Sequence, residues 1–247
     1  MEDAARATSL ADIAGFNEAT YAADRRGMLA MLHRKGWRAW FPRQSQRGMS
    51  NPIAWDASKF VLRGHRSVGV AEARHGGSPT RFVNLVVLRQ RGSGRRVVVL
   101  NTHTSTGGCR GGGLRRNDRT LKERRQLATI RGQMLRAERV TPNVVAIGDW
   151  NCDYLRDREV RAPGLPSDLL GPNVRFDMPL GDTLTNRHAE IDYVVTPRGP
   201  HTWLPVGGNI VTGFHSDHNA VLVGLEYADR PSGQLSATAR TRGGGMR

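Results

Sequence analysis

The stretch RFVNLVVLRQRGSGRRVVVLNTH, residues 81–103, decides which class of fold we expect. It holds two apolar runs, residues 81–89 and 95–103, on either side of the glycine-containing segment QRGSGR. β-Branched residues favour strands and a short segment with glycine favours a reversal of the chain, so the stretch predicts a β-hairpin. Successive strands joined in this way form antiparallel sheet, which argues against a doubly wound parallel fold.

Strand-like runs continue on both sides of this hairpin. Two amphipathic helices accompany them, residues 22–36 and residues 117–140, and a polar, loop-like segment covers residues 154–176. The other predicted strands are residues 12–19, 37–42, 51–55, 59–62, 67–74, 141–151, 190–197 and 219–227. This order of elements predicts a single α+β domain over residues 1–227.

The last twenty residues, 228–247, differ in composition from the rest of the chain. They hold four arginines and one aspartate with almost no apolar side chains. Such a segment cannot bury enough apolar surface to offset the entropy of ordering, so we expect a disordered basic tail.

The chain is strongly basic. Its 37 lysines and arginines stand against 22 acidic residues, a formal net charge of +15. A charge of this sign and size favours polyanionic partners such as nucleic acid, phosphoinositides or an anionic membrane surface. A genome of high GC content enriches arginine in its proteins and would produce the same balance. The charge therefore indicates a class of partner and not a fold.

The cysteines and the N-terminus bear on the compartment. Cys109 and Cys152 are too few for a disulfide scaffold and form no paired CxxC motif for zinc, which fits a reducing compartment. The first fifteen residues carry acids and no apolar core of a signal peptide, and no apolar stretch reaches 18 residues. We therefore expect a cytoplasmic monomer with no membrane segment.

Polar residues recur at the ends of separate apolar runs. They are Glu18, His103, Asp149 with Asn151, Asp192, and Asp217 with His218. Charged groups at the tips of buried strands are unfavourable without partners, so we expect them to converge on one site. Asp149 and Asn151 stand two apart, and on an extended segment their side chains share a face. An Asx turn is the alternative for this DWN sequence.

Five short motifs, NE, NTH, GDWN, EIDYVV and SDHNAV, occur in this order between residues 12 and 225. Together they resemble the endonuclease/exonuclease/phosphatase superfamily, which includes deoxyribonuclease I and the exonuclease III type of abasic endonuclease. The resemblance implies a four-layer α/β/β/α sandwich of two mainly antiparallel sheets. It also implies metal-dependent hydrolysis of phosphodiesters or phosphomonoesters, with Mg²⁺ or Mn²⁺ as the cofactor.

The resemblance implies a role for each strand-end residue. Glu18 binds the metal and Asp217 lies in the metal's shell, Asp149 positions or deprotonates the nucleophile, and Asn151 orients the phosphate. Asp192 pairs with His218, which contacts the phosphate, and His103 contacts the scissile phosphate or assists the leaving group. The residue before Glu18 is Asn17, where the family usually has Gln.

Two further interpretations concern the histidines of the segment around SDH. His215 precedes the motif and has no assigned role, so we expect a surface histidine. A zinc site formed by His215 and His218 is excluded, because this spacing at the entrance of a strand puts the rings on opposite faces and no further ligand follows nearby.

The substrate is not determined by the motifs. Residues 114–140 hold nine basic residues against three acids, and the glycine-rich segment 106–116 before them contains Arg110, Arg115 and Arg116. Glycines leave backbone N–H groups open to phosphates, so together with the basic tail this segment favours DNA, with these arginines in contact with it. A flexible loop followed by a solvated helix face is the alternative. DNA is favoured over RNA, and inositol phosphates or phospholipids remain the alternative substrates.

One departure from the family pattern concerns the N-terminus. The family's first strand carries an asparagine that helps to hold metal and nucleophile, whereas the segment MEDAARATSL, residues 1–10, reads as a helix. We therefore expect the sandwich to lack that strand. A weakly active or inactive DNA-binding relative stays open for this reason.

Overall fold

The computed structural model describes residues 2–19, 22–42, 51–71, 81–106, 109, 118–154, 166–177, 185–186, 189–199 and 202–227. Two of the predicted features fall outside these residues, namely the tail at 228–247 and the arginines at 110, 115 and 116. Among the described residues, no helix is long and apolar enough to cross a membrane.

One layer of the molecule is a six-stranded sheet with the order β4-β5-β6-β7-β9-β8. The pair β6 and β7 is parallel and the other pairs are antiparallel. The predicted hairpin is confirmed as β5 and β6. The strands are β4 (Phe60–Ala71), β5 (Arg81–Gln90), β6 (Arg96–His103), β7 (Val144–Asp149), β8 (Val174–Asp177) and β9 (Asp192–Pro197).

The facing layer consists of two separate antiparallel pieces. One piece is a three-stranded sheet in the order β1-β3-β2, and the other is the pair β10-β11. The strands are β1 (Ile13–Gly15), β2 (Trp37–Trp40), β3 (Ile53–Asp56), β10 (Trp203–Val211) and β11 (Ala220–Tyr227). Among the described strands β1 pairs with β3 alone and β11 with β10 alone.

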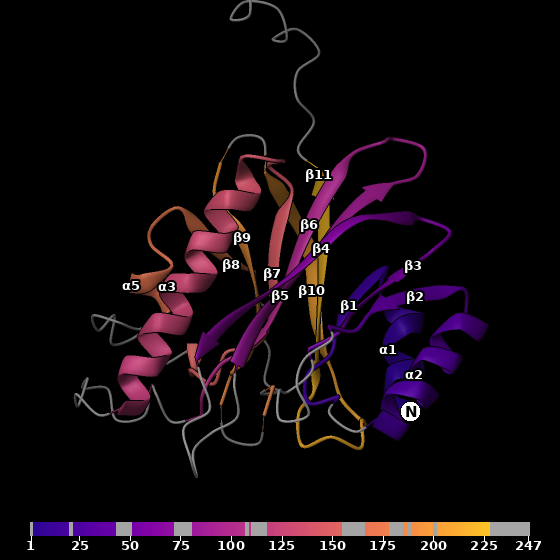
Figure 1. The fold of residues 1–247 in the computed structure, drawn as a ribbon, viewed down its shortest axis with the longest axis horizontal. Coiled ribbons are helices and arrows are strands. Elements are labelled where there is room, and N and C mark those ends of the chain that lie inside the picture. The colour runs from indigo at the N-terminus through magenta and orange to yellow at the C-terminus, as the bar shows by residue number, and fades with distance from the viewer. Residues whose placement is uncertain are drawn as a thin grey trace, which may run out of the picture.

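Helices cover both outer faces and complete the four layers (Figure 1). The helix α3 (Asp118–Glu138), with α5 (Pro166–Leu169), packs on the six-stranded sheet. The helices α1 (Glu2–Leu10) and α2 (Ala22–Arg34) pack on the three-stranded sheet, and α1 confirms the helix expected for the N-terminal segment. The architecture is thus the predicted α/β/β/α sandwich.

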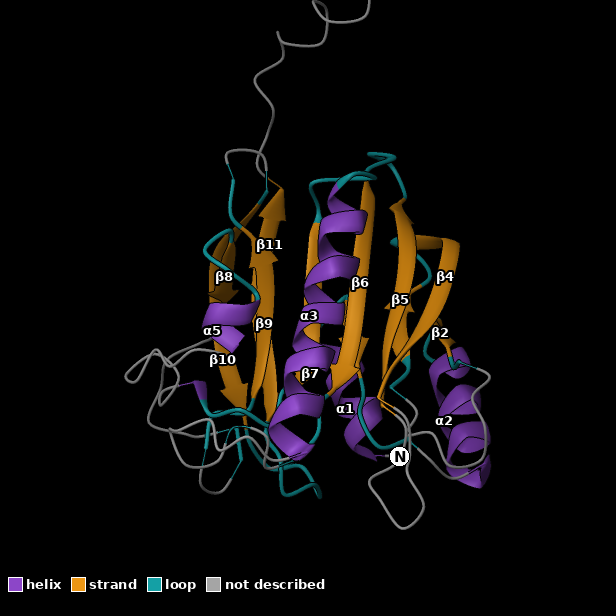
Figure 2. Ribbon diagram, turned by 60° about the vertical axis from the view of Figure 1, so that its left-hand side comes forward, coloured by secondary structure: helices purple, strands orange, loops and turns teal. Residues whose placement is uncertain are grey.

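The hydrophobic clusters on the two faces of the six-stranded sheet explain why strand β6 is apolar over residues 97–100. Val98 and Leu100 pack toward α3, while Val97 and Val99 pack toward the facing layer. Because successive side chains of a strand point to opposite faces, a strand covered on both sides needs apolar residues at every position. Figure 2 shows α3 lying along the central strands of this sheet.

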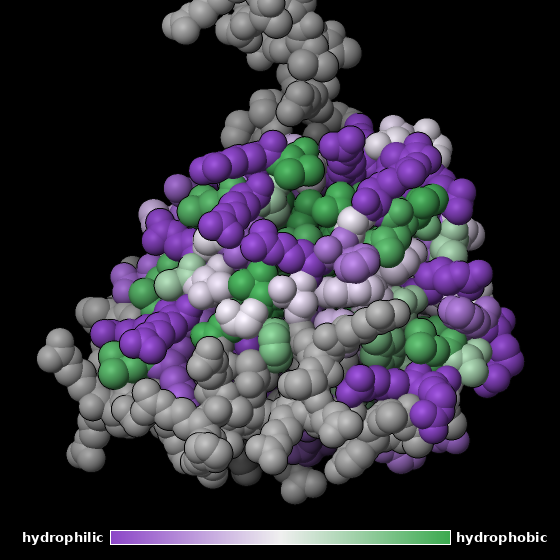
Figure 3. All heavy atoms as spheres, viewed as in Figure 1, coloured by the Kyte–Doolittle hydropathy of each residue, from purple (hydrophilic) through white to green (hydrophobic). Residues whose placement is uncertain are grey.

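The outer surface is more polar than the layers beneath it. On the face seen in Figure 3, hydrophilic side chains are interspersed with smaller apolar areas over the described residues. This distribution is in keeping with the high content of charged residues.

Several sequence predictions require correction. The runs 59–62 and 67–74 were predicted as two strands, but β4 joins them through register shifts that follow Leu62 and Gly69. The segment 154–176 was predicted as a loop, but it contains α5 and most of β8. Strand β10 was not predicted, because its sequence WLPVGGNIV contains one proline and two glycines, which are uncommon inside strands.

The two cysteines of the chain lie next to each other in the structure. Cys109 and Cys152 form a disulfide, with their Cα atoms 5.3 Å apart, which lies within the normal range for such a bond. Two cysteines make no scaffold, as expected, and they make this one cross-link between the segment after β6 and the turn after β7.

Candidate active site

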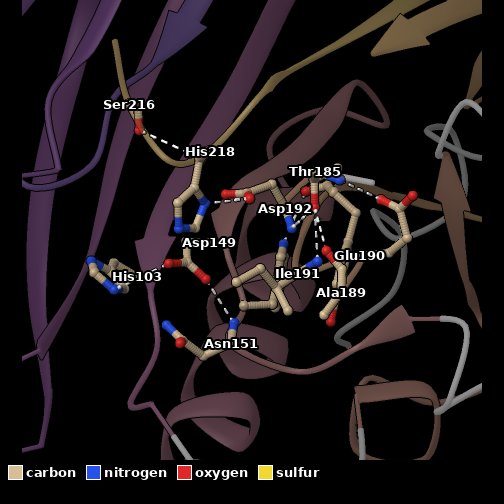
Figure 4. A network of polar contacts seen from close by, with 12 residues as sticks. His103, Asp149, Asn151, Thr185, Ala189, Glu190, Ile191, Asp192, Ser216 and His218 are labelled. Carbon is tan, nitrogen blue, oxygen red and sulfur yellow. Dashed lines mark hydrogen bonds and ion pairs between the residues drawn. The ribbon is translucent and has the colours of Figure 1, made fainter. Parts of the chain in front are cut away.

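The seven strand-end residues singled out in the sequence come together at one end of the sandwich. Glu18 follows β1, His103 and Asp149 end the parallel strands β6 and β7, and Asp192 begins the antiparallel strand β9. All seven line one cavity of about 1580 Å³. Figure 4 shows His103, Asp149, Asn151, Asp192 and His218 pointing toward one another.

Asp192 and His218 form the predicted pair. His218 Nδ1 lies 2.6 Å from Asp192 Oδ2, and this hydrogen bond raises the pKa of His218 to about 9. Burial raises the pKa of Asp192, while the hydrogen bond with His218 opposes that change. The imidazole of His218 is therefore positively charged at neutral pH and presents a cation to the cavity.

His103 and Asp149 form a second, more deeply buried contact. His103 Nε2 lies 3.3 Å from Asp149 Oδ2, and His103 Nδ1 lies 3.9 Å from Glu18 Oε1. Burial, together with the charge of Arg81, lowers the pKa of His103 to about 3, so its ring is neutral. Burial, together with the nearby charge of Asp192, raises the pKa of Asp149 to about 7.

The backbone of Asp149 is held from the facing layer. With its amide in the orientation that its neighbours require, Asn17 accepts a hydrogen bond from the Asp149 N–H at 2.9 Å. Its amide nitrogen then donates to the carbonyl oxygens of Phe16 and Thr102, both at 3.2 Å. Asn17 therefore joins the end of β1 to the ends of β6 and β7, a role that the sequence did not reveal.

Asn151 does not lie on an extended segment with Asp149, and this prediction is wrong. Strand β7 ends at Asp149, and Asn151 adopts a left-handed backbone with φ 48°. Its N–H donates to Asp149 Oδ1 at 2.8 Å, and its Nδ2 donates to the Thr104 carbonyl at 3.1 Å. The Asx-type contact thus coexists with the site. Trp150, between the two, is fully buried, as expected for a core residue.

Two further residues shape the site without a signal in the sequence. Thr185, which is fully buried, accepts hydrogen bonds at Oγ1 from the N–H groups of Ile191 at 2.9 Å and Asp192 at 3.1 Å. Gly148 has φ 141°, and a Cβ there would lie 1.9 Å from the Thr102 carbonyl oxygen. The hydrogen bonds of Thr185 and the close approach of Gly148 to Thr102 both depend on residues outside the local sequence. They are therefore seen only in the folded structure.

The predicted metal ligands Glu18 and Asp217 are less enclosed than the rest of the site. The Glu18 side chain is 63% exposed and Asp217 is exposed. In the described part of the chain, Asp149, Asp192 and His218 are the site residues whose ligand atoms all lie within 4.8 Å of one another.

The donor set fits a hard divalent cation. The carboxylates of Asp149 and Asp192 lie close enough to raise the pKa of Asp149 by repulsion, and a cation between or beside them would relieve it. Oxygen ligands of this kind suit Mg²⁺ or Mn²⁺, and Glu18 and Asp217 are further carboxylates on the wall of the same cavity.

His215 lies at the surface with its side chain 76% exposed. Its backbone N–H and its Nδ1 contact the carboxylate of Asp3, at 2.9 and 3.0 Å. This residue therefore ties the loop before β11 to the first turn of α1, away from the buried carboxylates.

The sequence matches no protein-family model, and no curated protein matches it. The structure is similar to that of the mannosyl-6-phosphatase Bt3783 of Bacteroides thetaiotaomicron, with a TM-score of 0.65, 14% identity, and coverage of 87% of this chain and 85% of that one. An endonuclease/exonuclease/phosphatase family protein of the same species has a TM-score of 0.65 and 15% identity, and the match covers 89% of this chain and 84% of that one. D. rerio TDP2, in complex with a single-strand DNA product, has a TM-score of 0.62 and 13% identity, and the match covers 91% of this chain and 92% of that one.

These likenesses show that the chain has the endonuclease/exonuclease/phosphatase fold. The resemblance seen in the five motifs is thereby confirmed at the level of architecture.

Proposed function

We propose that this protein is a divalent-metal-dependent phosphodiesterase that cleaves nucleic acid, with DNA preferred over RNA. The observation that carries the proposal is the charged His218–Asp192 pair beside the buried carboxylate of Asp149, in one cavity at the strand ends of this fold.

Each group suits a step of phosphate ester hydrolysis. Asp149, whose pKa is about 7, accepts a proton from the attacking water near neutral pH. The imidazolium of His218 stabilises negative charge on a phosphoryl oxygen, and Asp192 holds the orientation of its ring. The neutral ring of His103, held against Asp149, contacts the phosphate or the leaving oxygen.

A bound Mg²⁺ or Mn²⁺ would neutralise charge on the phosphoryl group, and Glu18 and Asp217, carboxylates on the wall of the same cavity, are the residues that would hold it. The turn at Asn151 keeps the carboxylate of Asp149 fixed through its N–H, so the base has a defined position. The side chain of Asn151 supplies an amide on the wall of the same cavity for orienting the phosphate.

The choice of nucleic acid rests on charge. The fold alone does not choose, because similar structures include a sugar phosphatase and a protein bound to a DNA product. A net charge of +15 suits a polyphosphate more than a small phosphate ester.

One panel of substrates tests the function. The protein is incubated with plasmid, abasic duplex, single-stranded DNA, RNA and inositol phosphates, each with Mg²⁺, with Mn²⁺ or with excess chelator. We expect nicking of plasmid DNA that requires the metal. Cleavage that persists undiminished in excess chelator would contradict the metal assignment. Turnover of inositol phosphates alone would favour the alternative substrate class. DNA binding without cleavage would indicate an inactive relative.

The basic segment is tested by salt dependence. Changing Arg110, Arg115 and Arg116 to serine should weaken DNA binding and lower the slope of log K against log salt by roughly one unit per lost phosphate contact. The matched control changes Arg91, Arg95 and Arg96 to serine, because these lie at the opposite end of β6 from His103. Equal slopes for both triple variants would remove the segment from the DNA interface.

A further inference from the structure

The disulfide between Cys109 and Cys152 lies at the rim of the active site, and the proposed hydrolysis does not use it. Cys109 lines the cavity that holds the site residues and is half-buried. Cys152, in contrast, is only 1% exposed. The two ends of the bond therefore differ in access, because a reagent that enters the cavity meets the Cys109 side first.

A fully buried carboxyl group lies behind the inner sulfur atom. Cys152 Sγ lies 4.0 Å from Oε1 of Glu123, a residue of α3. The other carboxyl oxygen, Oε2, accepts the N–H of Ser105 at 3.1 Å. In the described part of the chain, Cys109, Cys152 and Glu123 form a group whose sulfur and oxygen atoms all lie within 4.8 Å of one another. The carboxyl group therefore lies next to both sulfur atoms, and Ser105 holds it there.

The protonation state of Glu123 suits a proton donor. Burial raises the pKa of Glu123 to about 8, and the charge of Asp149 acts in the same direction. A side-chain hydrogen bond with Thr104, the N–H of Ser105 and the charge of Arg81 oppose this change in the pKa. At neutral pH Glu123 therefore carries a proton beside a sulfur atom that has none.

We propose that the bond between Cys109 and Cys152 is a site of reversible exchange with small thiols, opened from the active-site cavity. A thiolate attacks Cys109 Sγ, and Glu123 gives its proton to Cys152 Sγ as that sulfur leaves.

The choice of the leaving sulfur follows from the burial of the two cysteines. Attack on Cys152 is blocked by the protein around it, whereas Cys109 is open to the cavity. Attack on Cys109 places the negative charge on the buried sulfur of Cys152, and a buried thiolate is unfavourable unless it receives a proton or a charge partner. The proton of Glu123, 4.0 Å away, meets this requirement.

Atoms and electrons balance over two steps. In the first step, a bond forms between the incoming sulfur and Cys109 Sγ, and the electron pair of the broken bond goes to Cys152 Sγ, which takes the proton of Glu123. In the second step, another thiolate attacks the incoming sulfur, forms the disulfide of the small thiol and leaves Cys109 as a thiolate. Glu123 and Cys109 then regain protons from solvent, which received one from each attacking thiol. Two small thiols are oxidised to one disulfide, and the disulfide of the protein is reduced to two thiols.

Opening the bond acts on the turn that carries Asn151. This residue directly precedes Cys152, has a left-handed backbone, and donates its N–H to Asp149 Oδ1 (Figure 4). The disulfide adds a covalent link beside the hydrogen bond from Asn151 Nδ2 to the Thr104 carbonyl. Cleavage of the disulfide therefore loosens this turn, which under the proposed function supplies the amide that orients the phosphate.

Thiol trapping tests the proposal without any measurement of hydrolysis, so its failure is separate from failure of the proposed function. The full chain is treated with β-mercaptoethanol, quenched with acid, digested and mapped by mass spectrometry. We expect the mixed disulfide on Cys109 and a free thiol on Cys152. An adduct mainly on Cys152 overturns the proposal, and so does a purified chain with two free thiols that oxidised glutathione fails to join.

The variant Glu123→Gln tests the proton donor. Glutamine has nearly the same shape but is no acid, so reduction by dithiothreitol at neutral pH should be about tenfold slower than in the parent protein. The ratio of the parent rate to the variant rate should fall as the pH rises through about 8, where Glu123 loses its proton. The matched control is Glu138→Gln at the far end of α3, which should keep the parent rate. Equal rates for the parent and Glu123→Gln at neutral pH, or a ratio that does not change with pH, overturn the proposal.

Hydrogen exchange measures the effect on the turn. After reduction, exchange of the Asn151 N–H should become faster by about tenfold, with amides of β5 and β6 as the internal reference. The double variant Cys109→Ser and Cys152→Ser should show the fast exchange with or without the thiol. Exchange at Asn151 that is the same before and after reduction contradicts the inference that the bond holds the turn.

Discussion

The two β layers of this sandwich differ in how deeply their strands are buried and in how completely the strands are paired. In the six-stranded sheet the central residues of β6, Val97 to Leu100, are at most 1% exposed, and the strands are paired without a break. In the facing layer β11 is only partly buried along most of its length, and the layer is in two pieces.

The candidate site residues from the two layers differ in exposure in the same way. His103 and Asp149, which end strands of the complete sheet, are 3% and 6% exposed. Glu18, which comes from the interrupted layer, has a side chain 63% exposed. Continuous pairing and packing on both faces hold a side chain in one place, whereas a strand with one free edge leaves its neighbours open to solvent.

The largest expected effect comes from a methyl group added to the complete sheet. Gly148→Ala places a Cβ 1.9 Å from a backbone oxygen at a φ of 141°, and we expect it to lower the free energy of unfolding by about 4 kcal/mol or more. The matched change in the interrupted layer, Gly224→Ala, meets the end of the exposed Val206 side chain at 3.1 Å and the Gly207 carbonyl oxygen at an ordinary contact distance of 3.4 Å. It should cost about 1 kcal/mol. Chemical denaturation measures both, and equal losses would remove the contrast between the layers.

The next largest effect is on turnover. Asp149→Asn and His218→Ala should each reduce turnover by on the order of 10²-fold or more, because each removes a group that acts in the transition state. One residue comes from each layer, so similar losses would show that both layers supply the chemistry. The control is His215→Ala, which lies at the surface and should leave turnover close to that of the parent protein. A variant of Asp149 or His218 with the parent rate would exclude that residue from the site.

A smaller effect is expected at the junction between the layers. Thr185 accepts the N–H groups of Ile191 and Asp192, and its own carbonyl accepts the N–H of Asn219 beside β11. Thr185→Val removes the side-chain acceptor and should lower the free energy of unfolding by about 1–3 kcal/mol. Thr185→Ser keeps the oxygen and should lose less. If valine and serine behave alike, the hydroxyl does not hold Asp192.

The smallest expected effect is in the dependence of stability on pH. Because the pKa of His218 is raised from 6.5 to about 9 in the folded chain, the pair with Asp192 contributes its full stability below pH 6.5 and loses it as the pH rises through about 9. Melting temperatures across this range, with NMR titration of His218, measure the effect. Asp192→Asn should return the histidine to a lower pKa and flatten the profile, and an unchanged titration would exclude the pair as the cause.

Local patterns were enough to predict much of the fold and the members of the site. The hairpin of residues 81–103 could be predicted because valine-rich runs and a glycine turn act over a few residues. The residues of the site could be found because polar groups at the ends of apolar runs need a shared environment. Strand β10 was missed because its proline and glycines are unfavourable locally, and pairing with β11 along most of its length outweighs them.

The sequence by itself determined the α+β class, the order of most strands and helices, and the set of polar side chains at the strand ends, since each depends on residues that are neighbours along the chain. Only the tertiary structure decided the left-handed turn at Asn151, the need for glycine at position 148, the hydrogen bonds of Asn17 and Thr185, and the disulfide between Cys109 and Cys152. Each of these depends on atoms from segments distant in the sequence, because the approach of one backbone to another is set by packing and not by local preference.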